Sequence, residues 1–180
     1  MGRTKKAVLT VMLLVIALLW FADEYPALRF RGDAKFSGGP VLGYQIKMRP
    51  IPFYKAGEYV FHFRGLPNEE LTLQLYAEGK TDENREELTH LDTTLDALLL
   101  DQTGHIVCQA SGMPRDGQNE HIWVVKSSGS EAAFWHWNCT DVRLKPSVAY
   151  TLTLRVSNVD SKTPQINLLP VLEGGQLDLP

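Results

Sequence analysis

Three tryptophans are the residues of this sequence best suited to binding chemistry. Trp135 and Trp137 lie two positions apart in the run Phe134–Cys139, and Trp123 lies in an earlier apolar run. Alternate residues of a β-strand point to one face, so a strand here places both indoles side by side. The sequence favours a tryptophan-filled core, because a cysteine, Cys139, continues the alternation. The alternative is a carbohydrate-binding module, since flat indole rings can stack on the apolar faces of sugars.

The two cysteines offer the second kind of chemistry. Cys108 and Cys139 are the only cysteines, and both lie in strand-like sequence. In an oxidising compartment an even pair is most simply a disulfide. Closing a loop of about 32 residues would stabilise the fold by roughly 3–4 kcal/mol in the chain-entropy model. We therefore predict a Cys108–Cys139 disulfide on adjacent core strands; the alternative is two buried free thiols in a reducing compartment.

Sequence motifs of catalysis are missing. The sequence has no Gly-x-Ser-x-Gly elbow, phosphate-binding loop or dinucleotide-binding glycine pattern, and its five histidines are isolated from one another. Ser111, Asp116 and His121 could converge only through the tertiary structure. The sequence therefore favours a non-enzymatic protein without a metal or cofactor, and a hydrolase with a site in the polar loops is the alternative.

The amino terminus carries a targeting signal. An apolar run covers residues 7–22 and follows the basic residues Arg3, Lys5 and Lys6. As a helix it would be about 24 Å long, slightly short of a roughly 30 Å hydrocarbon core. We predict an uncleaved, single-pass signal-anchor, with residues 1–6 in the cytoplasm and the body outside, because basic flanks stay inside. The alternative is a cleaved signal peptide and a secreted protein.

The charge of the chain is unevenly distributed. The formal net charge is −3, and the three amino-terminal cations leave −6 on the residues from Asp23 onward. Binding to nucleic acid requires clustered Lys and Arg that displace counterions from phosphates. The body has no such basic stripe in its sequence. The sequence therefore argues against nucleic acid as a partner, and it does not predict that the body attaches to anionic lipid.

Strand signals follow one another along the rest of the chain. The clearest is the strict alternation of apolar and polar residues from Val148 to Val156. Further strands are expected at Leu42–Met48, Tyr59–Phe63, Leu71–Ala77, Leu95–Leu100, His105–Ala110, Ile122–Val125, Phe134–Cys139 and Ile166–Leu172. Pro164 and Pro170 predict an edge position for the last of them, because proline lacks the amide that a central strand donates.

These signals predict an all-β fold. About nine or ten strands without alternating helices indicate an antiparallel β-sandwich of Greek-key or jelly-roll type over residues 41–180. Residues 23–40, rich in charge and glycine, are expected to form a juxtamembrane linker.

The sequence therefore predicts a membrane-anchored extracytoplasmic domain, periplasmic or on the cell surface. Its expected role is a non-enzymatic protein-binding or structural module of the cell envelope or surface. The alternatives are the carbohydrate-binding module and the hydrolase.

Overall fold

The computed structural model describes most of the body and part of the amino-terminal segment. The described residues are 8–15, 29–39, 43–68, 70–78, 91–113, 131–139 and 144–174. Within 131–139 the description covers the backbone and excludes the side chains.

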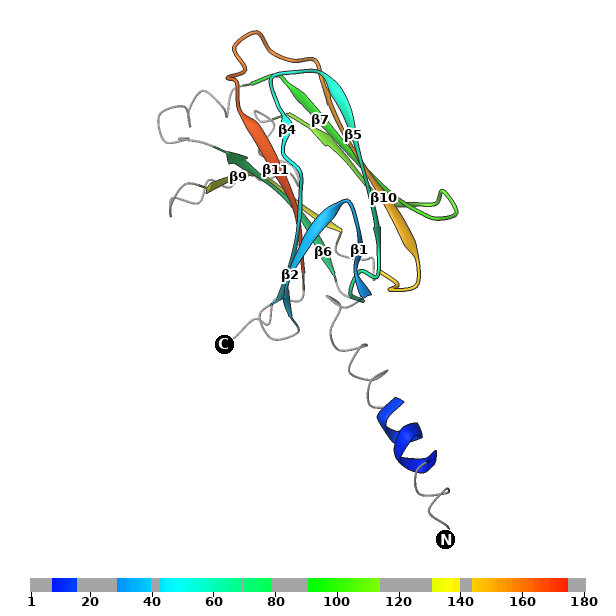
Figure 1. Ribbon diagram of the computed structural model, residues 1–180. Coiled ribbons are helices and arrows are strands. Elements are labelled where there is room, and N and C mark those ends of the chain that lie inside the picture. The colour runs from blue at the N-terminus through cyan, green and yellow to red at the C-terminus, as the bar shows by residue number, and fades with distance from the viewer. Residues whose placement is uncertain are drawn as a thin grey trace.

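The described strands form two antiparallel sheets, which confirms the predicted all-β fold (Figure 1). Sheet A has the order β1 (Arg31–Gly32), β5 (Gly57–Arg64), β10 (Ala149–Ser157), β7 (Thr94–Asp101), β8 (Ile106–Gly112). Sheet B has the order β2 (Ala34–Gly39), β3 (Gly43–Met48), β11 (Asn167–Gly174), β6 (Leu71–Glu78), β9 (Glu131–Cys139), and β4 (Ile51–Pro52) also pairs with β11.

The strand pairs are nested around the turn between β7 and β8. That hairpin is the innermost pair; β6 then pairs with β9, β5 with β10, and β3 and β4 with β11. Successive pairs alternate between the two sheets. Most of the strand pairs in the two sheets therefore join strands that are far apart in the sequence.

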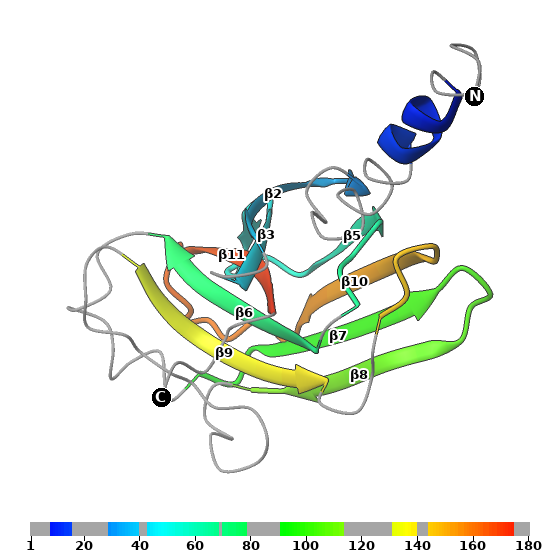
Figure 2. The same ribbon diagram turned by 90° about the horizontal axis from the view of Figure 1, so that it is seen from below.

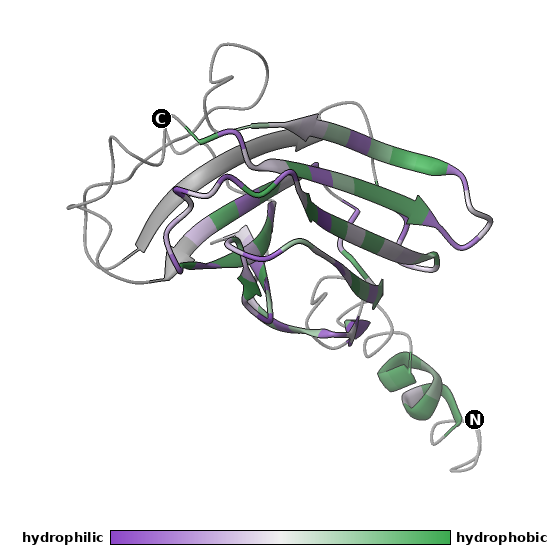
Figure 3. Cartoon of the chain, turned by 90° about the horizontal axis from the view of Figure 1, so that it is seen from above, coloured by the Kyte–Doolittle hydropathy of each residue, from purple (hydrophilic) through white to green (hydrophobic). Residues whose placement is uncertain are grey.

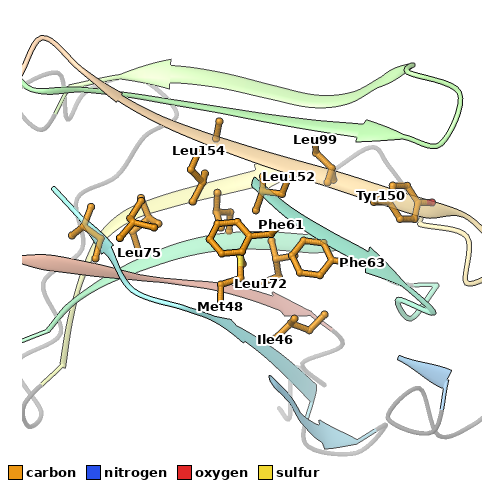
Figure 4. Packing of buried hydrophobic residues seen from close by; sticks show 14 of the residues in the cluster. Ile46, Met48, Phe61, Phe63, Leu75, Leu99, Tyr150, Leu152, Leu154 and Leu172 are labelled. Atoms are coloured by element: carbon orange, nitrogen blue, oxygen red, sulfur yellow. The ribbon is translucent and has the colours of Figure 1, made fainter. Parts of the chain in front are cut away.

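The inner faces of the two sheets bury one continuous apolar core. Phe61 and Phe63 of β5 are 0% and 2% exposed and lie between the sheets (Figure 4). Around them lie Leu99, Tyr150, Leu152 and Leu154 of sheet A and Ile46, Met48, Leu75 and Leu172 of sheet B. Burial of each large apolar side chain contributes roughly 1.5–3 kcal/mol. The alternation predicted for β10 is confirmed, since its apolar residues face this core.

Residues 31–39 form the two strands β1 and β2, separated by Asp33, although the sequence analysis places them in the linker. Ala34 and Phe36 of β2 pack against the core, and the Phe36 ring stacks on Tyr44 with centroids 6.0 Å apart. Ala34 and Phe36 alternate with polar residues as in a strand, but the glycines and charged residues of the same stretch obscure this pattern in the sequence. The body therefore begins before residue 41, and this segment belongs to the edges of both sheets.

β11 is a central strand, so its predicted edge position is wrong. It lies between β3 and β6, and its pairing with β6 runs without a break from Asn167 to Glu173. On its other side the pairing with β4 ends at Leu168, and the pairing with β3 begins at Val171. Pro170 falls in this gap. The proline is tolerated in a central strand because the neighbouring chain is interrupted beside it.

Residues 8–15 form a helix within the predicted membrane segment. Within the ranges described above, no helix is both long and apolar enough to cross a membrane. Residues 7 and 16–22 of the predicted segment, and the predicted strand 122–125, lie outside the described residues. The signal-anchor therefore stays a prediction.

Replacing Gly174 by alanine is expected to destabilise the fold. A Cβ atom there would lie 2.2 Å from the Tyr44 hydroxyl oxygen and 2.4 Å from the Glu70 carbonyl oxygen. Overpacking of this kind typically costs about 1–3 kcal/mol of unfolding free energy, which denaturant unfolding measures. Gly57→Ala is the matched control, because its Cβ would meet only the end of the Tyr59 side chain. Equal losses in the two variants would contradict this account.

Candidate binding face

The outer face of sheet A presents its side chains in four rows that cross the strands. Residues directly opposite each other in antiparallel pairs are neighbours on one face. The register of β5, β10, β7 and β8 sets the rows, and Figure 2 shows these strands side by side. From one end of β5 to the other the rows are Arg64 and Ala149; His62, Thr151, Leu100 and Ile106; Val60, Thr153, Leu98 and Gln109; Glu58, Arg155, Asp96 and Ser111.

The two middle rows, which we call the apolar band, hold four aliphatic side chains beside two threonines, His62 and Gln109. Ile106 is 51% exposed and Val60 is 36% exposed, while Leu98 and Leu100 are half-buried. Figure 3 shows green, hydrophobic segments along these strands. The sequence contains a signal for this band that its strand alternation does not reveal. Three consecutive leucines, 98–100, break the alternation and place apolar side chains on both faces of β7.

A row of charged residues borders the apolar band. Arg155 lies opposite Glu58 on one side and Asp96 on the other. The Ser111 hydroxyl donates a hydrogen bond to Asp96 Oδ1 at 2.5 Å. Cross-strand neighbours of opposite charge stabilise a sheet by a few tenths of a kcal/mol. This row therefore combines an exposed cation with two carboxylates at the edge of an apolar surface.

The turn that carries Ile106 is held by one carboxylate. Asp101 Oδ1 accepts hydrogen bonds from the Thr103 hydroxyl at 2.6 Å, the Thr103 N–H at 2.8 Å and the His105 N–H at 3.0 Å. These bonds, chiefly the one from the hydroxyl, hold the pKa of Asp101 below its ordinary value. The charged form of Asp101 therefore stabilises the turn at the end of the apolar band.

The outer face of sheet B uses its polar side chains internally. Glu173 is only 7% exposed, and its Oε1 accepts hydrogen bonds from the Gln45 amide at 2.9 Å and the Tyr76 hydroxyl at 3.1 Å. The same hydroxyl is hydrogen-bonded to Gln74 Oε1. Val171 beside Glu173 is 1% exposed. A buried carboxylate satisfied in this way is a structural element, so sheet A is the better candidate for binding.

The tryptophans predicted for a sugar platform are not assembled into a described site. Trp123 lies outside the described residues, and for Trp135 and Trp137 of β9 only the backbone is described. In the register of the sheet, Trp135 is opposite Leu75 and Trp137 is opposite Leu73. Both leucines are buried in the core. The platform and core interpretations both stay predictions.

The predicted disulfide connects positions in two different sheets. Cys108 lies on β8 opposite Leu99, is half-buried and carries no free thiol. Cys139 ends β9, and its side chain lies outside the described part. β8 and β9 each end their sheet, and Figure 2 shows the two strands at the same side of the sandwich. This corrects the prediction of adjacent strands, while the pairing of the two cysteines stays a prediction.

Of the three residues named for the hydrolase alternative, Ser111 is the one that lies in the described part of the chain. Ser111 is exposed and bonded to Asp96, whereas Asp116 and His121 lie outside the described residues. In the described part of the chain, no group of three or more His, Cys, Asp or Glu side chains could hold a metal ion.

Comparisons with known proteins do not assign the chain to a family. No protein-family model matches it, and no curated protein matches it. Among solved structures, the insecticidal delta-endotoxin Cry8Ea1 from Bacillus thuringiensis is similar over 70% of this chain, with 14% identity and a TM-score of 0.31. The match spans 19% of the endotoxin chain. A likeness at this level carries no argument about function.

We expect no free thiol when the denatured, unreduced chain is titrated with a thiol reagent. Cys108→Ser should lower the unfolding free energy by roughly 2–5 kcal/mol, because the cross-link restricts the unfolded chain. Reduction of the parent chain is the control, since it should bring the parent down to the stability of the variant. Two reactive thiols in protein taken from its native compartment would contradict the pairing.

Asp101→Asn is expected to destabilise the protein in a pH-dependent way. A folded pKa below the unfolded value of about 3.9 means that the stabilisation is complete above that value and is lost as the pH falls through the folded pKa. The unfolding temperature of the variant should therefore be lower than that of the parent at pH 7. The difference between the two temperatures should disappear as the pH is lowered. Thr103→Val, which removes only the hydroxyl, should show an intermediate effect. A variant as stable as the parent at pH 7 would refute this role.

Proposed function

We propose that this protein is a membrane-tethered, extracytoplasmic β-sandwich that binds a protein partner through the outer face of sheet A. The observation that carries this proposal is the apolar band, in which aliphatic side chains are exposed beside a row of charged residues. An apolar centre with a polar rim is the usual composition of a protein interface. The protein acts in this proposal as a binding module and not as an enzyme.

The finer form of the sandwich is a jelly roll. Its support is the nesting of the strand pairs, in which four successive pairs alternate between two sheets. A chain folded double and rolled in this way produces a jelly roll with two Greek keys.

The membrane tether is supported by the side chains of helix 8–15. All of its residues are exposed, and seven of them are large and apolar: Val8, Leu9, Val11, Met12, Leu13, Leu14 and Val15, between 49% and 69% exposed. Exposed apolar surface costs about 25 cal/mol per Å² in water. A helix that is apolar all round is suited to a hydrocarbon environment. The helix is almost uniformly green in Figure 3.

The location outside the cytoplasm has two supports. The basic residues that precede the apolar segment favour a cytoplasmic amino terminus. Cys108 carries no free thiol, as expected of a cysteine in an oxidising compartment.

A protein partner fits the described face better than a sugar does. Sugars stack on flat apolar aromatic rings, whereas the apolar band is built from leucine, isoleucine, valine and threonine, with His62 and Gln109 at its ends. The carbohydrate alternative therefore has weaker support than the protein-binding function.

Thr153→Arg is expected to abolish partner binding, because it places a long cation in the centre of the apolar band. The measurement is photo-cross-linking in native membranes from a benzophenone residue at position 106. Ser37→Arg is the matched control, since Ser37 is an exposed residue on the edge strand of sheet B. The control should keep the cross-linked species that Thr153→Arg loses. A parent chain that forms no cross-link, or one that both variants retain equally, would refute the proposed face.

A further inference from the structure

Strand β5 forms an edge of sheet A that is only partly covered. It pairs with β10 along its whole length without a register shift. On its other side β1 pairs only with Phe63 and Arg64, and Figure 1 shows β1 beside one end of β5. The chain then leaves for sheet B, where β2 pairs with β3 from Ala34 onward. We call residues 57–61 of β5, which have no strand on this side among the described residues, the open edge.

The backbone of His62 shows which residues of β5 direct their hydrogen-bonding groups to this side. Its carbonyl accepts a hydrogen bond from the Asp33 N–H at 3.0 Å, and its N–H donates to Asp33 Oδ2 at 2.9 Å. In an antiparallel strand the same groups of alternate residues point to the same side. The N–H and C=O groups of Val60 and Glu58 therefore point out of the open edge. No described residue of the chain forms a hydrogen bond with these four groups.

The open edge is more regular than the other described edges of the sandwich. The pairing of β7 with β8 shifts register between Leu99 and Leu100, and that of β6 with β9 shifts between Leu75 and Tyr76. β2 ends in two glycines, of which Gly38 has φ +100°. Bulges and irregular edge strands prevent the addition of further strands. The open edge has no bulge and no proline, so its geometry is suited to receive a strand.

Three polar side chains, which we call the Arg49 cluster, lie on the core side of the open edge. They are those of Arg49, Tyr54 and Tyr59. The guanidinium carbon of the exposed Arg49 lies 5.8 Å from the centroid of the Phe61 ring. Burial raises the pKa of Tyr59 above its ordinary value, the neighbouring Tyr54 also raises it, and Arg49 lowers it. The Tyr59 hydroxyl therefore lies within electrostatic reach of both other members.

The Arg49 cluster has no carboxylate partner among the described residues. Arg49 forms no ion pair with any of them, and residues 43–68 around it are all described. Glu58 keeps its negative charge but lies on the outer face of sheet A. Asp33 keeps its charge beside His62, three residues or about 10 Å along β5 from Tyr59. A guanidinium beside a phenolic hydroxyl is suited to a carboxylate, which it can bind through two parallel hydrogen bonds.

We propose that an extended segment of the protein partner joins sheet A as a strand at the open edge, and that an acidic residue of this segment binds Arg49. Antiparallel addition continues the line of β1 and pairs the segment with the free groups of Val60 and Glu58. The residue between these two pairs lies opposite Tyr59, so its side chain points to the Arg49 cluster. Its two neighbours point to the outer face, where one of them extends the row of Val60 in the apolar band.

This inference rests on the proposed function for the existence of a protein partner, and it adds how that partner is bound. The open edge and the apolar band share Val60, so one partner can occupy both. In strand addition the backbone hydrogen bonds supply affinity, and the side chains of alternate residues supply specificity. The open edge therefore requires a partner with an extended chain and a free backbone, which the apolar band alone does not.

The test measures peptide binding to the full chain in lipid nanodiscs by fluorescence anisotropy. The probe is a fluorescein-labelled peptide, Thr-Thr-Val-Glu-Val-Thr-Thr, whose sequence reads the same in both directions. Its matched control has glutamine in place of the glutamate. A second control has N-methyl groups on both valines, which removes the N–H donors that would pair with β5.

The expected result is that the glutamate peptide binds about tenfold more tightly than the glutamine peptide, as a hydrogen bond to a charged group provides. Arg49→Gln should remove this difference. Lys55→Gln, which removes another exposed cation of the same connection, should preserve it. The N-methylated peptide should not bind.

Glu58→Pro tests the backbone pairing, because the proline removes an N–H and places its ring on the open edge. Proline is tolerated in a strand where the missing N–H faces solvent. Glu58→Ala is the matched control, since it removes the same carboxylate and keeps the N–H. The proline variant should lose the peptide, and the alanine variant should bind it at least as tightly as the parent. Both should unfold at similar temperatures; if the proline variant does not fold, the N-methylated peptide supplies the same test on the parent.

Three results would overturn the inference: no binding of the glutamate peptide, equal affinities of the glutamate and glutamine peptides, or undiminished binding of the N-methylated peptide. The proposed face is tested separately, by the cross-link from position 106 and its loss in Thr153→Arg. A parent chain that binds the glutamate peptide but forms no such cross-link would refute the proposed face and leave the open edge as a peptide-binding site.

Discussion

The contact between the inner faces of the two sheets is the interaction on which the rest of this structure depends. Neither sheet could remain folded with its inner leucines and phenylalanines in water, and each supplies the cover that the other requires. Phe61 and Phe63 lie at the centre of this contact (Figure 4). The nested pairing means that most of these contacts join distant parts of the chain. The fold is therefore completed only when the entropy of closing several long loops has been offset by burial.

The two sheets are connected differently on the two open sides of the sandwich. On one side a single segment, residues 31–39, first pairs with β5 of sheet A and then with β3 of sheet B. Asp33 stands between these two pairings and exchanges hydrogen bonds with the His62 backbone through its N–H and its carboxylate. On the other side, β8 and β9 end the two sheets, and the predicted Cys108–Cys139 bond would join them there. A covalent bond there would link the two sheets, as the continuous backbone of residues 31–39 links them on the opposite side.

The two outer faces differ in how their polar groups are used. On sheet B, Glu173 is buried and satisfied by Gln45 and Tyr76, so its hydrogen bonds contribute to the fold. On sheet A, aliphatic side chains are exposed beside a row of residues of mixed charge.

The sequence by itself determined the strands whose side chains alternate cleanly, and hence the all-β class. In β10, Tyr150, Leu152 and Leu154 could be assigned to the core because a strand with one buried face has a strict period of two. The same reasoning failed for β2, whose period of two at Ala34 and Phe36 is masked by neighbouring glycines. The alternation of apolar and polar residues therefore identifies a strand where one face is buried and the buried residues are bulky.

Only the tertiary structure decided which strands are neighbours. Pro170 predicted an edge, yet β11 is central, because the strand beside it is interrupted where the amide is missing. The outward position of Ile106 and the meeting of Arg31 with Arg64 follow from register, which no short stretch of sequence encodes. Register is set by the sum of contacts across both sheets. The candidate face therefore exists only in the folded chain.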